Sequence, residues 1–519
     1  AYMNKFLDAK ITLIESNDIP ILGVGESSLP QIKTFFDAIG VEESEWMEKC
    51  NAVYKYGNIK TGWDKIDGKP FTFSFWHDDD NKFKKWYQQN KTKHQLNELY
   101  SKGEWGSIAY HLDAEKANTI MKNHCGNITH KVETLSELPE GYDLYVDCTG
   151  FKSLLLEGAL GVKFNGIENI IPNNKAWATH IPYTDKSKQL EPFTNCTALS
   201  NGWTWNIPLW SRIGAGYVYS DKYISDDEAL EEFKDYIRTR YDNIPIEDLE
   251  FKPITMRNGI HEKTWEKNVV AIGLSSGFVE PLESTGLMTT YEWLLSLIYT
   301  LRKGFVNQWD RDAFNYALRN IFYGHANFVG MHYALSSRDD TPYWQDVTER
   351  VRIDPTINNS LNYETEMGEN LELLYYATSA YKYHQFREGT AGFQCVAAGM
   401  NYSPIDAQMH RSLGKLKGFD PEMHCDRLQE LYRETQQKYI NYAETLPSLY
   451  EYLCKTIHDS SGDMTFVGTE NDVPQHIWDS MPDRVKMKVK KKERKSIEPT
   501  YRDTNQKWKQ RPKGFVTYE

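Results

Sequence analysis

The 519-residue chain has few of the features that mark membrane, disulfide-stabilised or nucleic-acid-binding proteins. No apolar run approaches the length of about 18 residues that a membrane-spanning helix needs, and no signal peptide opens the chain. The seven cysteines are scattered and include no Cys-x-x-Cys pair, which argues against a disulfide framework and against a metal site. A net charge of −13 argues against broad nucleic-acid binding. We therefore predict a soluble, cytoplasmic protein with neither a membrane nor a metal ion as partner.

What the chain does contain predicts a large globular protein. A hydrophobic content of 40% and an aromatic content of 13% suffice for a sizeable core and more than one lobe. Amphipathic stretches predict helices at 30–39, 287–303, 311–335 and 426–445. One basic stretch, residues 484–495, is interpreted as a solvated tail, with a polyanion contact as the alternative.

The N-terminal residues predict part of a dinucleotide-binding unit. Residues 11–16 have the pattern of a buried strand that ends in an acid, and in such a unit this acid accepts hydrogen bonds from the adenosine ribose. Glu15 is the candidate. The first strand and the Gly-x-Gly-x-x-Gly turn of the unit are expected upstream of the first residue, on the order of 20 residues away. Strands predicted at 142–150 and 269–273 also run into glycine turns, so three strand ends are expected around one extended cofactor.

The segment 278–286, FVEPLESTG, lies between an apolar run and a predicted helix. The start of a helix exposes backbone N–H groups that can hold an anion, and Glu283 places a carboxylate beside it. The segment therefore indicates chemistry, although Ser284 and Thr285 are also residues that commonly cap helices.

Four motifs in order resemble signatures of the flavin-dependent halogenases of the tryptophan-halogenase type, over roughly residues 1–456. Residues 23–26 resemble the flavin strap, and 203–208, WTWNIP, resemble the Trp-x-Trp-x-Ile-Pro element of this family. Residues 278–286 are similar to a second family signature, and 336–342, SSRDDTP, also recur in the family.

The resemblance implies an α/β fold with a discontinuous FAD-binding lobe, Rossmann-like and of the flavin-monooxygenase type, and a mostly helical substrate-binding lobe. We assign to the FAD-binding lobe residues 1–50, 104–160 and 262–305. The substrate-binding lobe and its inserts take residues 51–103, 161–261 and 306–457, and residues 458–519 form a basic C-terminal tail.

The resemblance also implies an activity, in which reduced FAD (FADH2) and O2 oxidise a halide ion to hypohalous acid. The acid passes to Lys55, whose amine becomes a haloamine or, if protonated, orients the acid by a hydrogen bond. Glu283 stabilises the positive charge on the substrate ring and accepts its proton, and Ser284 beside it is a third candidate catalytic residue. Glu280 is the competing carboxylate, and Lys60 and Lys65 are expected to be ordinary surface lysines. A separate flavin reductase and a homo-oligomeric state are further expectations.

The remaining implied site residues fall into three groups. FAD would be bound by Glu15, Val24, Gly25, Ser27, Leu274 and Leu287. The halide would be held by the amides of Thr285 and Gly286. The wall of a tunnel between flavin and substrate would be formed by Trp203, Trp205, Phe278 and Pro281.

The expected substrate pocket departs from the family pattern. Tyr375 and Tyr376 resemble a pair that grips the backbone of free tryptophan, but Lys382 stands where the family has a glutamate that binds the substrate ammonium group. A lysine would repel that group, so we expect an indole- or phenol-like arene other than free tryptophan. Its ring would lie against Phe75, Trp76, Tyr375 and Phe386. The open alternatives are a flavin-dependent aromatic monooxygenase and a non-catalytic flavoprotein relative.

Overall fold

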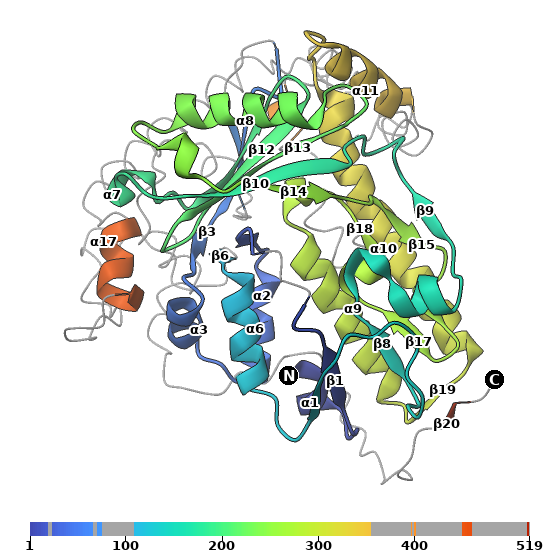
Figure 1. Cartoon of the computed structure of the whole chain (residues 1–519). Helices are drawn as coiled ribbons and strands as arrows, with labels where there is room; N and C mark the ends of the chain where they lie inside the picture. Colours follow the sequence, from blue (N-terminus) through green and yellow to red (C-terminus); the bar gives the residue numbers. More distant parts are fainter. Residues whose placement is uncertain are drawn as a thin grey trace, which may run out of the picture.

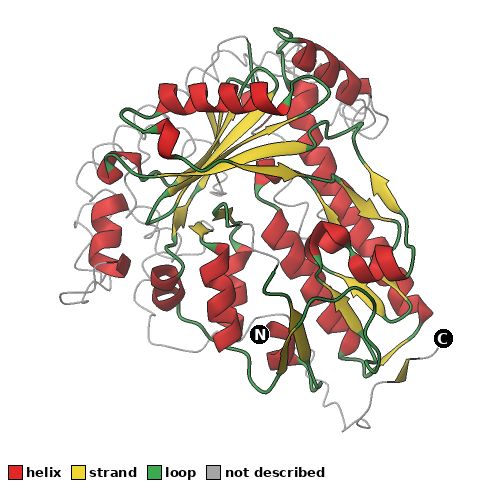
Figure 2. Ribbon diagram, in the orientation of Figure 1, coloured by secondary structure: helices red, strands yellow, loops and turns green. Residues whose placement is uncertain are grey.

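The computed structural model describes residues 1–18, 23–65, 70–74, 108–353, 396, 399–400, 449–458 and 516–517. A large mixed sheet occupies one part of the molecule, and several small sheets with helices beside them form the other (Figures 1 and 2). This arrangement confirms the predicted α/β class.

The large sheet has seven strands in the order β14-β10-β13-β12-β11-β4-β5. Its neighbours are antiparallel except for β11 and β4, which are parallel. The strand bounds are β4 Gly57–Thr61, β5 Phe71–Ser74, β10 Lys175–Ile181, β11 Phe193–Ala198, β12 Gly202–Pro208, β13 Ile213–Tyr219 and β14 Lys252–Thr255. Every residue of β12 and β13 is buried, which explains their high content of aromatic and small residues.

Helix α8, Asp226–Arg240, covers one face of this sheet (Figure 1). A capping box between Ser225 and Glu228 starts the helix, and its apolar stripe of Ala229, Phe233 and Ile237 is buried. Strands therefore form much of the region that we assigned to the substrate-binding lobe, alongside its helices.

The predicted nucleotide-binding strands lie in small sheets. Strand β1, Thr12–Glu15, runs parallel to β7, Thr129–Val132. Strand β8, Tyr145–Asp147, runs parallel to β17, Val269–Ala271, which also pairs with β16, Trp265–Glu266. These strands confirm the three predictions with narrower bounds.

A third small sheet has the order β2-β6-β3, and β3 is followed along the chain by β4 of the large sheet. Its strands are β2 Glu26–Ser27, β3 Val53–Lys55 and β6 Ala109–Leu112. The helices of this part of the chain are α1 Tyr2–Phe6, α2 Gln31–Ile39, α3 Glu43–Lys49 and α6 Ala114–Asn123. Helix α2 confirms the prediction at 30–39.

Between β17 and the predicted helix, the chain does not pass directly from strand to helix. It forms a 3-10 turn, Gly273–Ser275, then β18, Gly277–Phe278, and a second 3-10 turn, Pro281–Glu283, before α9, Gly286–Leu301. Strand β18 pairs with β15, Gly259–His261, which also pairs with β9, Phe164–Gly166. Left-handed backbone at Gly273 (φ 75°) and Ser284 (φ 59°) makes these reversals possible.

Helix α10, Gln308–Leu335, confirms the prediction at 311–335 and begins earlier because Asn307 and Asp310 form a capping box. Helix α11, Pro342–Ile353, and helix α17, Leu449–Leu453, follow, whereas the helix predicted at 426–445 lies outside the described residues. Near the C-terminus, β20, Val516–Thr517, pairs with β19, Phe305–Val306. The remaining elements are Gly150–Lys152 (3-10), Leu154–Ala159 (π), Lys186–Gln189 (α7), Ile246–Asp248 (3-10) and Cys454–His458 (π).

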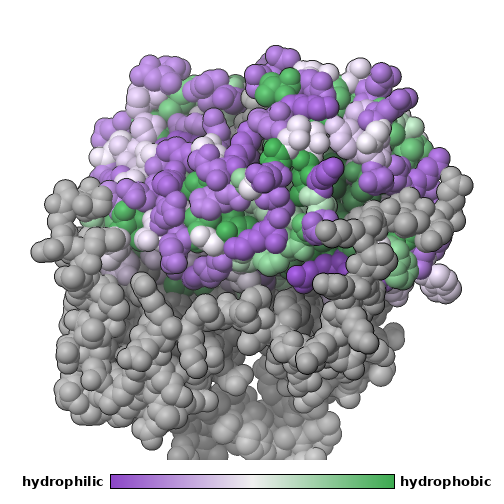
Figure 3. Space-filling view, turned by 90° about the horizontal axis from the view of Figure 1, so that it is seen from below, coloured by the Kyte–Doolittle hydropathy of each residue, from purple (hydrophilic) through white to green (hydrophobic). Residues whose placement is uncertain are grey.

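Hydrophilic side chains cover most of the described surface in the view from below, with smaller hydrophobic areas between them (Figure 3). In the described ranges, no helix combines the length and the apolar content needed to cross a bilayer. The same ranges bring together no three His, Cys, Asp or Glu side chains as metal ligands.

Candidate active site

Lys55 is a fully buried amine at the end of β3. Its Nζ donates to the Ser284 hydroxyl at 2.9 Å and to the Ser28 carbonyl at 3.1 Å. Burial lowers the pKa of Lys55 to about 7, while the nearby charge of Glu283 opposes that shift. Near neutral pH the amine is therefore available both as a base and as a donor.

Ser284 is held in an uncommon conformation directly after the 3-10 turn Pro281–Glu283. Its left-handed backbone ends the turn, and its hydroxyl accepts from Lys55 and donates to Ser27 at 2.9 Å. Thr285 occupies the N-cap position of α9, but in the described chain no side-chain hydrogen bond caps this helix, so the alternative interpretation of Ser284 and Thr285 as side-chain caps is not supported. The hydroxyl of Ser284 is instead committed to the buried site.

Glu283 faces a second buried lysine. Lys60 Nζ lies 2.6 Å from one Glu283 oxygen and donates to the Leu282 carbonyl at 2.9 Å, and Asn58 donates to the other Glu283 oxygen at 3.0 Å. Burial alone would raise the pKa of Glu283, but the charge of Lys60 outweighs it and the pKa falls to about 2. Glu283 is therefore an ionised carboxylate throughout the working range of pH.

A histidine of α10 completes the surroundings of Glu283. His332 Nε2 lies 3.0 Å from the same Glu283 oxygen that Lys60 contacts, and His332 Nδ1 lies 3.0 Å from the Phe328 carbonyl. Each ring nitrogen of His332 therefore faces an oxygen atom, one of Glu283 and one of the backbone.

The expectation that Lys60 is a surface lysine is wrong, because its side chain has 0% exposure. Lys60 and Asn58 share one face of β4, two residues apart, and β4 lies between β11 and β5. In the sequence, the indication that Lys60 is buried was this pair of polar residues, two positions apart in a short strand. Lys65 is 56% exposed and confirms the same expectation for itself.

Glu280 has a different set of partners. It accepts from Trp203 Nε1 at 3.2 Å, from Tyr333 at 2.5 Å and from Asn173 at 3.1 Å. Burial raises the pKa of Glu280 to about 7, although these hydrogen bonds oppose the shift. The two carboxylates are therefore separate, and Glu280 fixes the orientation of a tryptophan.

The two tryptophans of the candidate tunnel, Trp203 and Trp205, are buried on one face of β12, with ring centroids 6.3 Å apart. Gly216 lies opposite Trp205, where a Cβ would approach the indole to 2.1 Å. Phe278 is partly buried with its ring against Phe151, and Pro281 is exposed. The tunnel role of these four candidates stays a prediction.

The candidate FAD-binding residues lie on separate elements of the nucleotide region. Glu15 ends β1, where its carboxylate contacts Lys122 and His130 at 2.5 and 2.8 Å. Ser27 lies in β2, Leu274 is exposed in a 3-10 turn, and Leu287 is in the first turn of α9.

The loop at Val24 and Gly25 approaches the large sheet closely. His180 Nε2 lies 2.7 Å from the Gly23 carbonyl, and Arg212 donates to that carbonyl at 3.0 Å. Gly25 has φ 92°, and a Cβ there would meet the Leu209 side chain at 3.4 Å. A left-handed glycine in a loop fixed from one side fits a backbone that lies against a flat ligand, so these residues fit a flavin.

The halide candidates Thr285 and Gly286 lie at the start of the 16-residue helix α9. A Cβ built on Gly286 would meet no atom within 4 Å. An open helix start offers N–H groups and a positive dipole end to an anion, which fits a halide.

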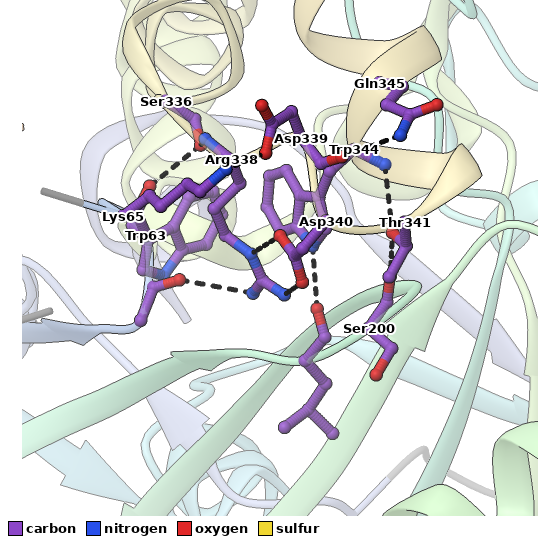
Figure 4. A network of polar contacts seen from close by, with 12 residues as sticks. Trp63, Lys65, Ser200, Ser336, Arg338, Asp339, Asp340, Thr341, Trp344 and Gln345 are labelled. Carbon is purple, nitrogen blue, oxygen red and sulfur yellow. Dashed lines mark hydrogen bonds and ion pairs between the residues drawn. The ribbon is translucent and has the colours of Figure 1, made fainter.

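The 336–342 signature forms a polar network (Figure 4). Arg338 binds both Asp340 oxygens, at 2.9 and 2.7 Å, and lies over the Trp344 ring at 4.6 Å. Arg338 also donates to the Gly62 carbonyl at 3.2 Å, and Ser336 donates to the Trp63 carbonyl at 2.8 Å. The signature joins α10 and α11 to the end of β4, so its role is structural.

Six candidate substrate residues lie outside the described residues: Phe75, Trp76, Tyr375, Tyr376, Lys382 and Phe386. Their grouping into one pocket stays a prediction.

The fold and this buried site define an α/β protein with a protected lysine and carboxylate. The tryptophan halogenase family profile matches residues 1–127 and 111–413. Tryptophan 7-halogenase RebH of Lentzea aerocolonigenes is 30% identical over 87% of this chain and 95% of its own length. The structure of tryptophan 6-halogenase SttH of Streptomyces toxytricini is 27% identical with a TM-score of 0.71, covering 87% of this chain and 95% of its own. The apo structure of VirX1 is 29% identical with a TM-score of 0.73, covering 89% and 96%.

The chain belongs to the tryptophan halogenase family and is a flavin-dependent halogenase. This membership confirms the resemblance seen in the four sequence motifs.

The 23–25 loop approaches β13 closely, and a substitution in β13 can test the role of this loop in FAD binding. In Gly214→Ala the new methyl carbon would lie 1.9 Å from the Val24 carbonyl oxygen, so the loop must move. We expect FAD affinity to fall about tenfold or more, a loss of roughly 1.4 kcal/mol, in a fluorescence titration. Gly158→Ala, whose methyl meets no atom closer than 3.8 Å, is the matched control. Equal FAD affinity in wild type and Gly214→Ala would contradict a flavin role for this loop.

Proposed function

We propose that the protein transfers oxidised halogen through Lys55 to an electron-rich arene other than free tryptophan. Bound reduced FAD, supplied by a separate reductase, would provide hypohalous acid from O2 and a halide. The single observation that carries the proposal is the fully buried Lys55 amine, hydrogen-bonded to Ser284, the residue next to the Glu283 carboxylate.

The candidate FAD and halide residues would hold the reactants. Glu15, Gly25 and Ser27 would contact FAD, and the first amides of α9 at Thr285 and Gly286 would hold the halide. Trp203, fixed by its hydrogen bond to Glu280, would separate substrate from flavin.

Two roles of Lys55 agree with its surroundings. As a neutral amine it attacks the halogen atom of hypohalous acid, and as an ammonium group it orients the acid by a hydrogen bond. Glu283, ionised and fixed by Lys60 and Asn58, would stabilise the positive charge that develops on the arene.

The identity of the arene rests on Lys382, whose charge would repel a substrate ammonium group. The relatives named as tryptophan halogenases make free tryptophan the necessary comparison. We expect neutral indoles and phenols to be halogenated at a higher kcat/KM than free tryptophan.

The test is a panel of free tryptophan, indole, substituted indoles and phenols. Each is incubated with protein, FAD, a flavin reductase, O2 and either chloride or bromide, and products are read by mass spectrometry. Halide-dependent mass gains on indoles or phenols are the expected result. Oxygen insertion that is independent of halide would favour an aromatic monooxygenase, and a protein that never binds FAD would favour a non-catalytic relative.

A further inference from the structure

A row of hydrogen bonds leads from Lys55 into the interior of the protein. Lys55 Nζ donates to Ser284 Oγ at 2.9 Å, and Ser284 Oγ donates to Ser27 Oγ at 2.9 Å. Ser27 Oγ lies 2.7 Å from Thr194 Oγ1. Each step is within the distance of an ordinary O–H or N–H hydrogen bond.

The row continues through Thr194 to His111, a buried histidine of β6. Thr194 Oγ1 lies 2.8 Å from His111 Nε2, and His111 Nδ1 lies 3.0 Å from the Pro208 carbonyl. The sequence motifs singled out neither Thr194 nor His111. Register across the sheets brings them together, because they lie on β11 and β6.

The direction of every hydrogen bond follows from the two ends. The Pro208 carbonyl can only accept, so His111 Nδ1 must carry a hydrogen, and the neutral ring then accepts at Nε2. Thr194 therefore donates to His111, and Ser27 donates to Thr194. From the other end, Ser284 accepts from Lys55 and donates to Ser27. All the donors point the same way, from Lys55 toward His111.

The row is closed to bulk solvent along most of its length. Lys55 and His111 have 0% exposure, and Thr194 and Ser284 have 3% and 4%. Ser27, in the middle of the row, is half-buried. A continuous row of hydroxyls offers a path through the protein to a proton that leaves the Lys55 ammonium group.

A positive charge on Lys55 disfavours a positive charge on His111. Burial first and the Lys55 charge second hold the pKa of His111 well below its usual range. Besides burial, the titratable groups that act on the pKa of Lys55 are Glu283, Cys196 and Lys60. Once Lys55 is neutral, its repulsion of a proton on His111 disappears, while burial continues to favour the neutral imidazole at rest.

We propose that Ser284, Ser27 and Thr194 carry a proton between Lys55 and His111, which acts as a buried proton acceptor for the reactive amine. This relay rests on the proposed role of Lys55 in halogen transfer.

In the forward step one N–H bond of the Lys55 ammonium group breaks and its proton goes to Ser284 Oγ. The Ser284 hydrogen passes to Ser27, the Ser27 hydrogen to Thr194, and the Thr194 hydrogen to His111 Nε2. The step leaves a neutral amine and an imidazolium, and no electrons change hands. The amine lone pair can then form an N–halogen bond with hypohalous acid, whose hydroxyl group leaves as water with a proton from the amine.

Thr194→Val is the central variant, because valine keeps the shape of the side chain and removes the hydroxyl. Interrupting a proton relay is expected to lower single-turnover halogenation of indole about 10²-fold, the lower end of general acid–base contributions. Thr194→Ser, which restores a hydroxyl, is expected to stay within about threefold of wild type. Thr197→Val, on the same strand but outside the row, is the matched control and should behave as wild type.

The solvent isotope effect separates a relay from a packing role. In wild type and Thr194→Ser we expect a slower rate in D2O with a curved dependence on deuterium content, because several hydrogens move together. Thr194→Val should lose that curvature. A Thr194→Val protein that keeps both the wild-type rate and the curvature would overturn the relay.

A second measurement needs neither flavin nor substrate. In protein labelled with [15N]histidine, NMR should show His111 neutral and protonated at Nδ1, and Thr194→Val should shift its Nε2 resonance. A hydrogen on Nε2, or an Nε2 resonance unmoved by the substitution, would overturn the row of donors.

Failure of the relay is distinguishable from failure of the proposed function. Wild type and Lys55→Ala would halogenate equally if Lys55 had no role, whatever the Thr194 variants do. A wild type that needs Lys55 but is indifferent to Thr194 would remove the relay alone.

Discussion

Replacing Lys55 with alanine is expected to abolish halogenation while FAD binding stays within about twofold of wild type. The amine is fully buried beside Ser284 and Glu283, so bulk water provides no substitute at this position. Mass spectrometry of the products and a fluorescence titration with FAD provide the two readouts. Lys65→Ala, at an exposed lysine, is the control. Halogenated product from Lys55→Ala at the wild-type rate would rule out the amine as the halogen carrier.

The two possible roles of Lys55 give opposite dependences on pH. With a pKa of about 7, the amine becomes mostly neutral as pH rises through 7, so a haloamine route speeds up across that range. A route that needs the ammonium group slows down over the same range. Lys55→Arg keeps a permanent positive charge and loses the nucleophilic amine. We expect the rising profile in wild type and an inactive Lys55→Arg; an active arginine variant would point to the ammonium role.

The second large effect is expected at Glu283. Glu283→Gln keeps the shape of the side chain but removes the charge that would stabilise the arene cation, so turnover should fall by roughly 10² or more. A loss of less than a few-fold would contradict this role. Glu280→Gln is the matched comparison, because Glu280 is equally buried but bound to Trp203 and Tyr333. We expect it to affect turnover less than Glu283→Gln.

The positive charge of Lys60 stabilises the ionised form of Glu283. Lys60→Met would leave a buried carboxylate without its closest cation, at a cost of about 3–5 kcal/mol in the free energy of unfolding. Without that charge the pKa of Glu283 rises, so activity should be lost on acidification at a higher pH than in wild type, whereas protonation of the unpaired carboxylate should recover part of the lost stability. The double variant Lys60→Met/Glu283→Gln should regain much of the stability, because no unpaired charge remains, but not the turnover. Denaturant unfolding and pH–rate profiles measure both, and equal stability of wild type and Lys60→Met would argue against the ion pair.

Much of the nucleotide region could be predicted from local sequence. The strands β1, β8 and β17 are short apolar runs. The helices α2, α9 and α10 show helical periodicity, with residues at their ends that typically start or stop a helix. Only the family motif distinguished Lys55 from its neighbouring lysines, and the structure places Lys55 in the interior.

The rest of the site depends on long-range pairing, which local patterns do not contain. Lys60 is buried because β4 has a strand on each side, and one of them, β11, lies far along the chain. Thr194 and His111 are also brought together by strands that lie far apart in the sequence. Ser284 does not cap α9, as its residue type alone allowed, because its hydroxyl bonds Lys55 and Ser27, which lie far away in sequence.

The parallel pairing of β4 with β11 also has a consequence for biogenesis. The segment that carries Lys60 leaves the ribosome long before the strand that completes its surroundings. Nascent or truncated chains that end before β11 cannot shelter this cation, and Glu283 emerges later still. The buried Lys60–Glu283 ion pair is therefore expected only in chains that have been translated past α9, and shorter products should lack halogenase activity.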